Sequence, residues 1–231
     1  MSAVSAAGLS RRYGRRWALA NVGFDVPEGA LVMVAGRNGS GKTTLLRILS
    51  TALRPDMGTV RIFGQDVSRE RELVRQKIAL LGHRTHLYEP LTAMENLVIS
   101  ARFLGRDTSR PRLISLLEEV GLADREGDSV QTFSAGMRQR LALARALQQE
   151  PKVLLLDEPY GHLDPPGFLM VDGLLQRMRR EGVTVLMSTH LIARGRTICD
   201  HGLVLDAGRL TFSGKISDMP VSGAEGFAEG A

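Results

Sequence analysis

The sequence holds a single cysteine and no long apolar run, and each shortage excludes a class of protein. With Cys199 alone, the chain can form neither an internal disulfide nor a cysteine-based metal cluster, which fits a reducing compartment. The longest uncharged apolar stretch covers residues 30–35. A membrane-spanning helix needs roughly 18 such residues, and the N-terminus lacks the apolar core of a signal peptide. We therefore expect a cytoplasmic chain.

The composition is that of a globular protein with a surplus of positive charge. A chain of 231 residues with 43% hydrophobic content can bury one or two cores without disulfides or metals. The net charge is +5, and Arg11, Arg12, Arg15 and Arg16 lie close together near the start. A solvated basic face near a triphosphate or an acidic membrane surface accounts for this charge. Since the sequence has no nucleic-acid recognition motif, we expect no nucleic-acid partner.

A glycine-rich segment with the spacing of a phosphate-binding loop follows the apolar run over residues 31–35. Gly36 and Gly41 bracket four residues and precede Lys42 and Thr43. In this pattern backbone N–H groups surround the β-phosphate, the lysine reaches the β and γ oxygens, and the hydroxyl binds Mg²⁺. Apolar residues at helical spacing follow, so the loop is expected between a buried strand and a helix N-terminus. The predicted nucleotide-binding residues here are Gly36, Arg37, Asn38, Gly39, Ser40, Gly41, Lys42, Thr43 and Thr44.

The order of the apolar segments predicts an α/β fold. Residues 22–26 and 59–63 are expected to be strands of an early antiparallel β portion beside the phosphate loop. Thr92 and Glu95 predict a capping box at the start of one helix, and a second helix is expected from about Pro111 to Gly121. After Pro151, helical stretches separate short apolar strands over residues 153–156, 183–187 and 203–205, and a turn at residues 207–208 leads into a last strand over residues 210–212. This alternation indicates a mostly parallel sheet.

We expect one domain in which a helical block interrupts the α/β core. Residues 1–85 and 151–219 are assigned to the nucleotide-binding core and residues 86–150 to the helical subdomain. Residues 220–231, rich in Gly, Ala and Ser, are expected to form a flexible tail. The sequence shows no internal repeat.

Two acidic residues end the apolar strand over residues 153–156. Asp157 and Glu158 are therefore expected at the carboxyl edge of the sheet, where α/β proteins bind their ligands. Asp157 is the candidate Mg²⁺ ligand beside Thr43, partly through water. Glu158 is the candidate base for the water that attacks the γ-phosphate. Without the phosphate loop, a helix cap would be the better interpretation of such acids.

A further motif, Phe133-Ser134-Ala135-Gly136-Met137, opens a helix between the phosphate loop and these acids. With all three motifs the chain resembles the ATP-binding cassette (ABC) family, whose signature is usually Leu-Ser-Gly-Gly-Gln. The resemblance extends from about residue 9 to residue 215. It implies an ATPase that uses ATP and Mg²⁺ and pairs head to tail with a second copy. In that arrangement residues 134–137 of one copy meet the γ-phosphate held by Lys42 of the other.

Three further residues resemble functional positions of the family. Tyr13, followed six positions later by Leu19, resembles the aromatic residue that stacks on adenine, and Trp17 is the alternative. Asp164 resembles the aspartate in the loop that crosses the dimer interface in this family. His190, after the strand over residues 183–187, resembles the switch histidine that touches the γ-phosphate.

The chain also departs from the family pattern. His83 stands where the family commonly has the glutamine that senses Mg²⁺ and the attacking water. An imidazole can still bind water, but its charge varies near neutral pH. Ala135 replaces the first signature glycine and Met137 the usual glutamine, while Gly136 remains. We therefore expect a working signature with slower turnover.

The resemblance implies a peripheral ATPase on the cytoplasmic face of the membrane that drives an integral membrane subunit. His83 after a glycine, together with Ser-Ala-Gly, resembles the ATPase subunit of the bacterial haem exporter of cytochrome c biogenesis. Arg84 departs from that subgroup. Subunits of drug or other small-molecule exporters share most of these motifs and form the alternative.

Two other classes differ from this pattern. Soluble ABC ATPases that act on DNA or ribosomes carry long coiled-coil insertions or paired cassettes, and this chain has one cassette and no heptad run. A nucleotide-binding regulator without turnover would lack Glu158 or His190, and both are present.

Overall fold

Two β-sheets organise the chain, and the computed structural model describes them over residues 2–220. The four-stranded sheet is antiparallel, with strand order β2-β1-β4-β5. Its strands are β1 (Ser2–Tyr13), β2 (Arg16–Pro27), β4 (Met57–Ile62) and β5 (Gln65–Asp66). The flexible tail predicted over residues 220–231 lies outside the described residues, except for residue 220.

The second sheet has six strands in the order β10-β9-β3-β8-β7-β6. All neighbours in it are parallel except β10, which pairs antiparallel with β9. The strands are β3 (Leu31–Ala35), β6 (Ile78–Leu81), β7 (Val153–Asp157), β8 (Thr184–Ser188), β9 (His201–Asp206) and β10 (Arg209–Lys215). The predicted fold class, an α/β core with an N-terminal antiparallel sheet, is therefore confirmed.

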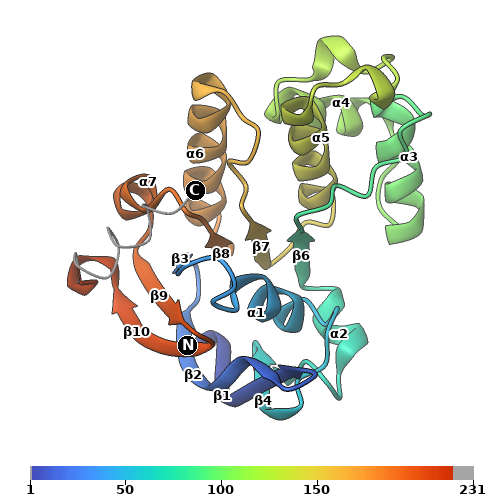
Figure 1. Cartoon of the computed structure of the whole chain (residues 1–231). Helices are drawn as coiled ribbons and strands as arrows, with labels where there is room; N and C mark the ends of the chain where they lie inside the picture. The colour runs from blue at the N-terminus through green and yellow to red at the C-terminus, as the bar shows by residue number, and fades with distance from the viewer. Residues whose placement is uncertain (1, 221–231) are drawn as a thin grey trace.

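Helices cover both faces of the six-stranded sheet and form a separate block between β6 and β7 in the sequence (Figure 1). The block contains α3 (Ala93–Leu104), α4 (Arg110–Glu119) and α5 (Ala135–Leu147), all within the range predicted to be helical. The remaining helices are α1 (Lys42–Leu49), α2 (Arg71–Arg75), α6 (Pro165–Arg180) and α7 (Ile192–Ile198). Short 3-10 turns span Ala123–Arg125, Val130–Thr132 and Ile216–Asp218.

Local signals explain where the helices of the block begin and end. The Thr92 hydroxyl accepts a hydrogen bond from the Glu95 backbone N–H at 3.1 Å. The Glu95 carboxylate accepts one from the Thr92 N–H at 2.8 Å, so the predicted capping box is present. The helix predicted from about Pro111 is α4, and it ends two residues before Gly121. Gly121 adopts a positive φ of 65°, a conformation that stops a helix.

The first strand, β1, was not predicted from the sequence. Its register against β2 shifts at several places, for example between Ala6 and Leu9. Each shift interrupts the two-residue alternation by which a strand is recognised. The short strand β6 also went unpredicted, although its residues are apolar.

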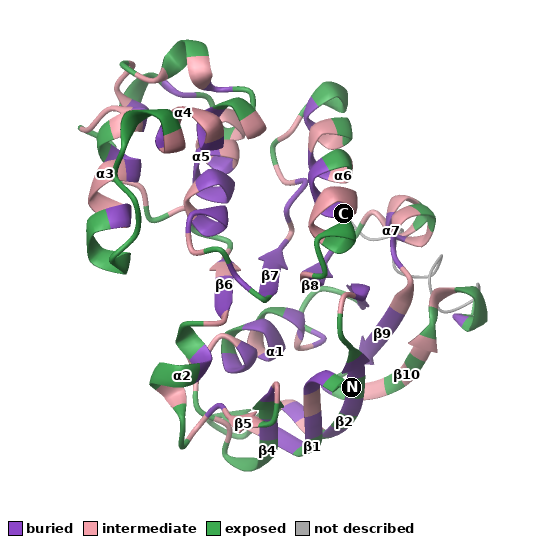
Figure 2. Ribbon diagram, turned by 180° about the vertical axis from the view of Figure 1, so that it is seen from behind, coloured by how far each residue is buried: buried purple, intermediate pink, exposed green. Residues whose placement is uncertain are grey.

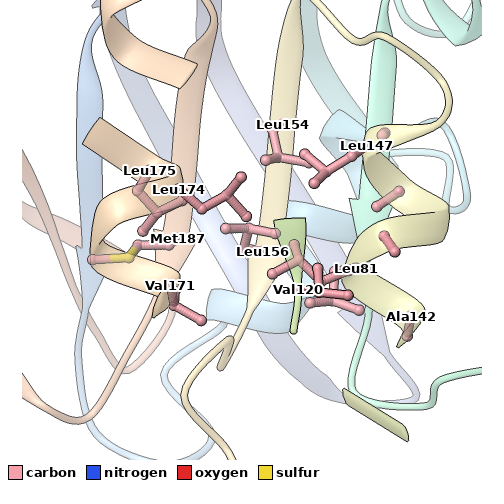
Figure 3. Close-up of a cluster of buried hydrophobic side chains, with 14 of the residues drawn as sticks. Leu81, Val120, Ala142, Leu147, Leu154, Leu156, Val171, Leu174, Leu175 and Met187 are labelled. Atoms are coloured by element: carbon pink, nitrogen blue, oxygen red, sulfur yellow. The ribbon is translucent and has the colours of Figure 1, made fainter. Parts of the chain in front are cut away.

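Three central strands, β3, β7 and β8, are buried at every residue and so on both faces. Figure 2 shows β7 and β8 in the colour of buried residues. Alternate side chains of each strand therefore enter two different cores. Val153 and Leu155 join α1 and the antiparallel sheet in one core. Leu154 and Leu156 join α5 and α6 in the other, which Figure 3 shows in close-up. Both cores fix the same strand ends, where the site lies.

We expect Leu156→Ala to destabilise the protein by about 2–5 kcal/mol, because it leaves a cavity in a closely packed core. Leu156 is fully buried, and the substitution removes contacts directly beside Asp157. The measurement is urea unfolding followed by circular dichroism. Leu169→Ala is the matched control, since the Leu169 side chain is 67% exposed. A similar loss of stability in both variants would contradict the described packing.

Candidate functional site

The phosphate loop, residues 36–43, connects β3 to α1 at the carboxyl edge of the six-stranded sheet. Gly41 has a φ of 111°, and a Cβ atom there would lie 2.5 Å from the Ala18 carbonyl oxygen. A side chain at position 41 would therefore force the loop away from β2. The Lys42 ammonium group donates to the carbonyls of Gly36 at 2.6 Å and Arg37 at 3.2 Å. Lys42 is thus folded back along the loop.

Burial lowers the pKa of Lys42 from its usual value, while the charges of Glu158 and Asp157 oppose this shift. The opposing carboxylates show that lysine and acids share one electrostatic environment. An ammonium group that has lost much of its hydration interacts strongly with any phosphate that reaches it.

A cavity of about 460 Å³ brings most of the predicted site residues together. Its volume falls within the range of small-molecule sites, roughly 300–1,000 Å³. The residues that line it come from β1, β2, the phosphate loop with α1, the segment after β6, and the end of β7. They are Tyr13, Arg16, Ala18, Asn38, Gly39, Gly41, Lys42, Thr43, Thr44, His83, Asp157 and Glu158.

The two acids are held at the end of β7 by a serine of the neighbouring strand. Ser188 Oγ donates a hydrogen bond of 2.6 Å to Asp157 Oδ1. The Glu158 N–H donates to Ser188 Oγ at 3.0 Å and to the Ser188 carbonyl at 3.2 Å. Asp157 is buried, with 5% of its surface exposed. Sequence analysis missed Ser188, whose only local signal is its place at the end of an apolar run.

His190 contacts the candidate base directly. Its Nδ1 lies 2.9 Å from Glu158 Oε2, and its backbone N–H donates to the same oxygen at 3.3 Å. The imidazole is 65% exposed, whereas the Glu158 side chain is 23% exposed. With Nδ1 protonated, the ring donates to Glu158 and leaves Nε2 to a further partner.

His83 lies on the wall of the same cavity, in the segment that follows β6. Arg145 of α5 holds this segment, because its guanidinium donates to the backbone carbonyls of Thr85 and His86. Sequence analysis did not single out Arg145. The arginine connects the helix that carries the signature to the segment that carries His83.

Oxygen donors in the cavity suit Mg²⁺. The Thr43 hydroxyl and the Asp157 carboxylate both line it, and Mg²⁺ is typically held by one or two such groups together with phosphates and waters. Within residues 2–220, no three His, Cys, Asp or Glu side chains cluster as a metal-binding group. Thr43 and Asp157 would hold the ion, and phosphate oxygens and waters would complete its coordination.

The register of the first hairpin distinguishes the two candidate stacking rings. Tyr13 lines the cavity, whereas Trp17 lines a separate hollow with Arg12. Each ring has an arginine beside it, Arg11 at 5.3 Å from the centre of the Tyr13 ring and Arg12 at 5.6 Å from that of Trp17, so only the cavity lining separates them. Geometry thus favours Tyr13 as the platform for a base.

The signature residues do not reach this cavity within one chain. Ser134 caps α5, its hydroxyl accepting from the Met137 N–H at 3.2 Å. Gly136 packs against the loop before α6, where a Cβ atom would lie 2.7 Å from the His162 carbonyl oxygen. Asp164 caps α6 by accepting from the Gly167 N–H at 3.0 Å. Gly136 thus packs against His162 and Leu163, and none of the four signature residues lines the cavity that holds Lys42.

Comparison with known proteins gives a consistent result. The ABC transporter family model matches residues 19–161. The daunorubicin resistance ATP-binding protein DrrA3 of Streptomyces coeruleorubidus is 40% identical, over 94% of this chain and 70% of that protein. The ABC transporter ATP-binding protein NatA of Bacillus subtilis is 33% identical, over 87% of this chain and 83% of that protein.

A bacterial ABC transporter cassette solved as a dimer superimposes with a TM-score of 0.85 at 29% identity, over 92% of this chain and 98% of that one. The same cassette in a post-hydrolysis state with ADP and phosphate gives a TM-score of 0.83 at 27% identity, with the same coverage. No helix within residues 2–220 is long and apolar enough to span a membrane. The chain belongs to the ABC transporter family, as a subunit that hydrolyses ATP.

Proposed function

We propose that this chain is the ATPase subunit of an exporter of drugs or other small molecules. The names of its relatives support this reading, since DrrA3 is a drug-resistance protein. Neither DrrA3 nor NatA is named as a haem exporter. These relatives therefore favour export of drugs or other small molecules over export of haem. The chain acts at the cytoplasmic face of a membrane and drives an integral membrane subunit.

One observation supports the mechanism most strongly. Lys42, Asp157 and Glu158 share a single cavity, whereas the signature residues lie outside it. A site that binds the γ-phosphate from one side only is incomplete. A second copy, placed head to tail, would supply Ser134 and the N-terminus of α5 on the other side. The solved dimer of the similar cassette shows that such chains do pair.

The contacts of the acids support a division of roles. Asp157 is held rigidly by Ser188 and is the candidate Mg²⁺ ligand together with Thr43. Glu158 is half-buried and is the candidate base for the attacking water. His190 bonds the Glu158 carboxylate, so it keeps the base in place and offers its other nitrogen toward the γ-phosphate. Bound Mg²⁺ neutralises charge on the phosphates during transfer.

Glu158→Gln should retain ATP binding and lower the ATPase rate at least about a hundredfold, because the amide cannot accept the proton of the attacking water. Dimers should accumulate with ATP, since hydrolysis no longer separates them. Rates come from phosphate release, and association from light scattering. Glu118→Gln on the exposed side of α4 is the matched control. An ATPase rate near that of the control would show that Glu158 is not the base for the attacking water.

Two inactive variants should complement each other if the signature acts across a dimer. Lys42→Ala damages the phosphate loop, and Gly136→Asp damages the signature. A mixed dimer of these variants keeps one complete site. An equal mixture should therefore recover about a quarter of the unaltered ATPase rate, since half of random dimers are mixed and each holds one intact site of two.

The controls are each variant alone and proof by circular dichroism that both fold. If the mixture is no more active than the sum of its parts, although mixed dimers form, the signature does not act in trans.

Isolation from membranes tests the transporter assignment. The tagged chain, extracted in mild detergent, should recover a polytopic membrane protein in a stoichiometric amount. The control uses the same extraction without the tag. Recovery with ribosomes or DNA instead would favour a soluble ABC ATPase and would contradict the proposal that this chain is a transporter subunit.

A further inference from the structure

Arg16 belongs to the basic cluster near the start of the chain, and no role for it follows from the family motifs. In the hairpin of β1 and β2, Arg16 is the cross-strand partner of Tyr13. Directly paired residues point to the same face of an antiparallel pair. Accordingly, both Tyr13 and Arg16 line the 460 Å³ cavity.

The guanidinium of Arg16 reaches the phosphate loop. A Cβ atom at Gly39 would lie 3.6 Å from Arg16 Nη2, which is ordinary van der Waals contact. The arginine therefore spans from the hairpin to the backbone of the loop. The same cavity is lined by Tyr13, where a base would stack, and by the loop whose amides would surround the phosphates.

Backbone contacts fix the hairpin relative to the loop. The Ala20 N–H donates to the Gly208 carbonyl at 2.8 Å, and the Gly208 N–H donates to the Ser40 carbonyl at 3.0 Å. The turn between β9 and β10 thus links β2 to the phosphate loop. Ala18, two residues from Arg16, also lies against Gly41, so β2 contacts the phosphate loop at a second place. These contacts fix the backbone that carries Arg16 close to the loop.

The charges around Arg16 leave its guanidinium available. Within residues 2–220 no ion pair or side-chain hydrogen bond involves Arg16, whereas Arg11 pairs with Asp56 at 2.7 Å. Arg12 lies against the Trp17 ring outside the cavity. Arg16 and Lys42 are the two cationic side chains among the residues that line this cavity. Arg16 therefore adds a second positive charge to a space that Asp157 and Glu158 also line.

We propose that Arg16 is a nucleotide-binding residue that clamps the phosphate chain against the loop while Tyr13 holds the base. This inference rests on the proposed nucleotide site. The planar guanidinium can donate two parallel hydrogen bonds to phosphate oxygens. A triphosphate would then be held from two sides, by loop amides with Lys42 and by the hairpin with Arg16. A solvated surface arginine that touches no ligand is the competing interpretation.

Arg16→Ala should weaken ATP and ADP binding about five- to tenfold at low salt, because one charge-assisted contact is lost. The affinity for adenosine should stay unchanged, since adenosine has no phosphates. Dissociation constants are measured by competition against a fluorescent ATP analogue with the whole chain. The loss should shrink between about 0.05 and 0.5 M salt, because screening weakens an exposed contact. Arg16→Lys should recover part of the affinity, since it keeps the charge without the planar fork.

Arg12→Ala is the matched control, because it removes the same charge from the same hairpin on the side away from the cavity. Its ATP affinity should stay within twofold of the unaltered chain. Equal affinities of Arg16→Ala and Arg12→Ala for ATP would overturn the assignment of Arg16 while leaving the nucleotide site intact. If the unaltered chain bound no ATP at all, the proposed function and this inference would both fall. Circular dichroism of each variant verifies that the hairpin change leaves the fold unaltered.

Discussion

The site depends on one constraint, the burial of three adjacent parallel strands on both faces. Because β3, β8 and β7 are neighbours and run the same way, their carboxyl ends meet at a single edge of the sheet. Ser188 is paired with Val34 on one side and Asp157 on the other, so the strand register alone places it between the loop and the acids. Its hydroxyl then fixes Asp157. The geometry of the candidate site therefore depends on the packing that holds these three strands in register.

Many features of this arrangement could be predicted from the sequence because their signals are local. The spacing of Gly36, Gly41 and Lys42 specifies the loop, and the capping box of Thr92 and Glu95 specifies the start of α3. Strands such as β3 and β7 are short apolar runs of a length that only a buried strand fits well. In each case residues close together in the sequence are enough to predict the element, and the tertiary structure does not change it.

Other features could not be predicted because they arise only when distant segments meet. Ser188 acts through strand register, and Arg145 acts through the carbonyls of Thr85 and His86. The spacing of Tyr13 to Leu19 favours Tyr13 over Trp17 already in the sequence, but the physical reason, that the two rings line different hollows, appears only in the folded hairpin. The cargo is a different case. The site described here handles ATP, so a name such as haem exporter rests on a few motif residues and has little physical support.

The segment after β7 connects the two halves of the proposed composite site. Glu158 bonds His190 at one end of this segment, and six residues later Asp164 caps α6 at the other. In between, the His162 carbonyl packs against Gly136 of the signature so closely that no side chain fits there. Movement of the signature helix would therefore push on the backbone that carries the base. In the proposed head-to-tail dimer, that helix would face the partner's nucleotide, so each site would sense the state of the other through a short and tightly packed length of chain.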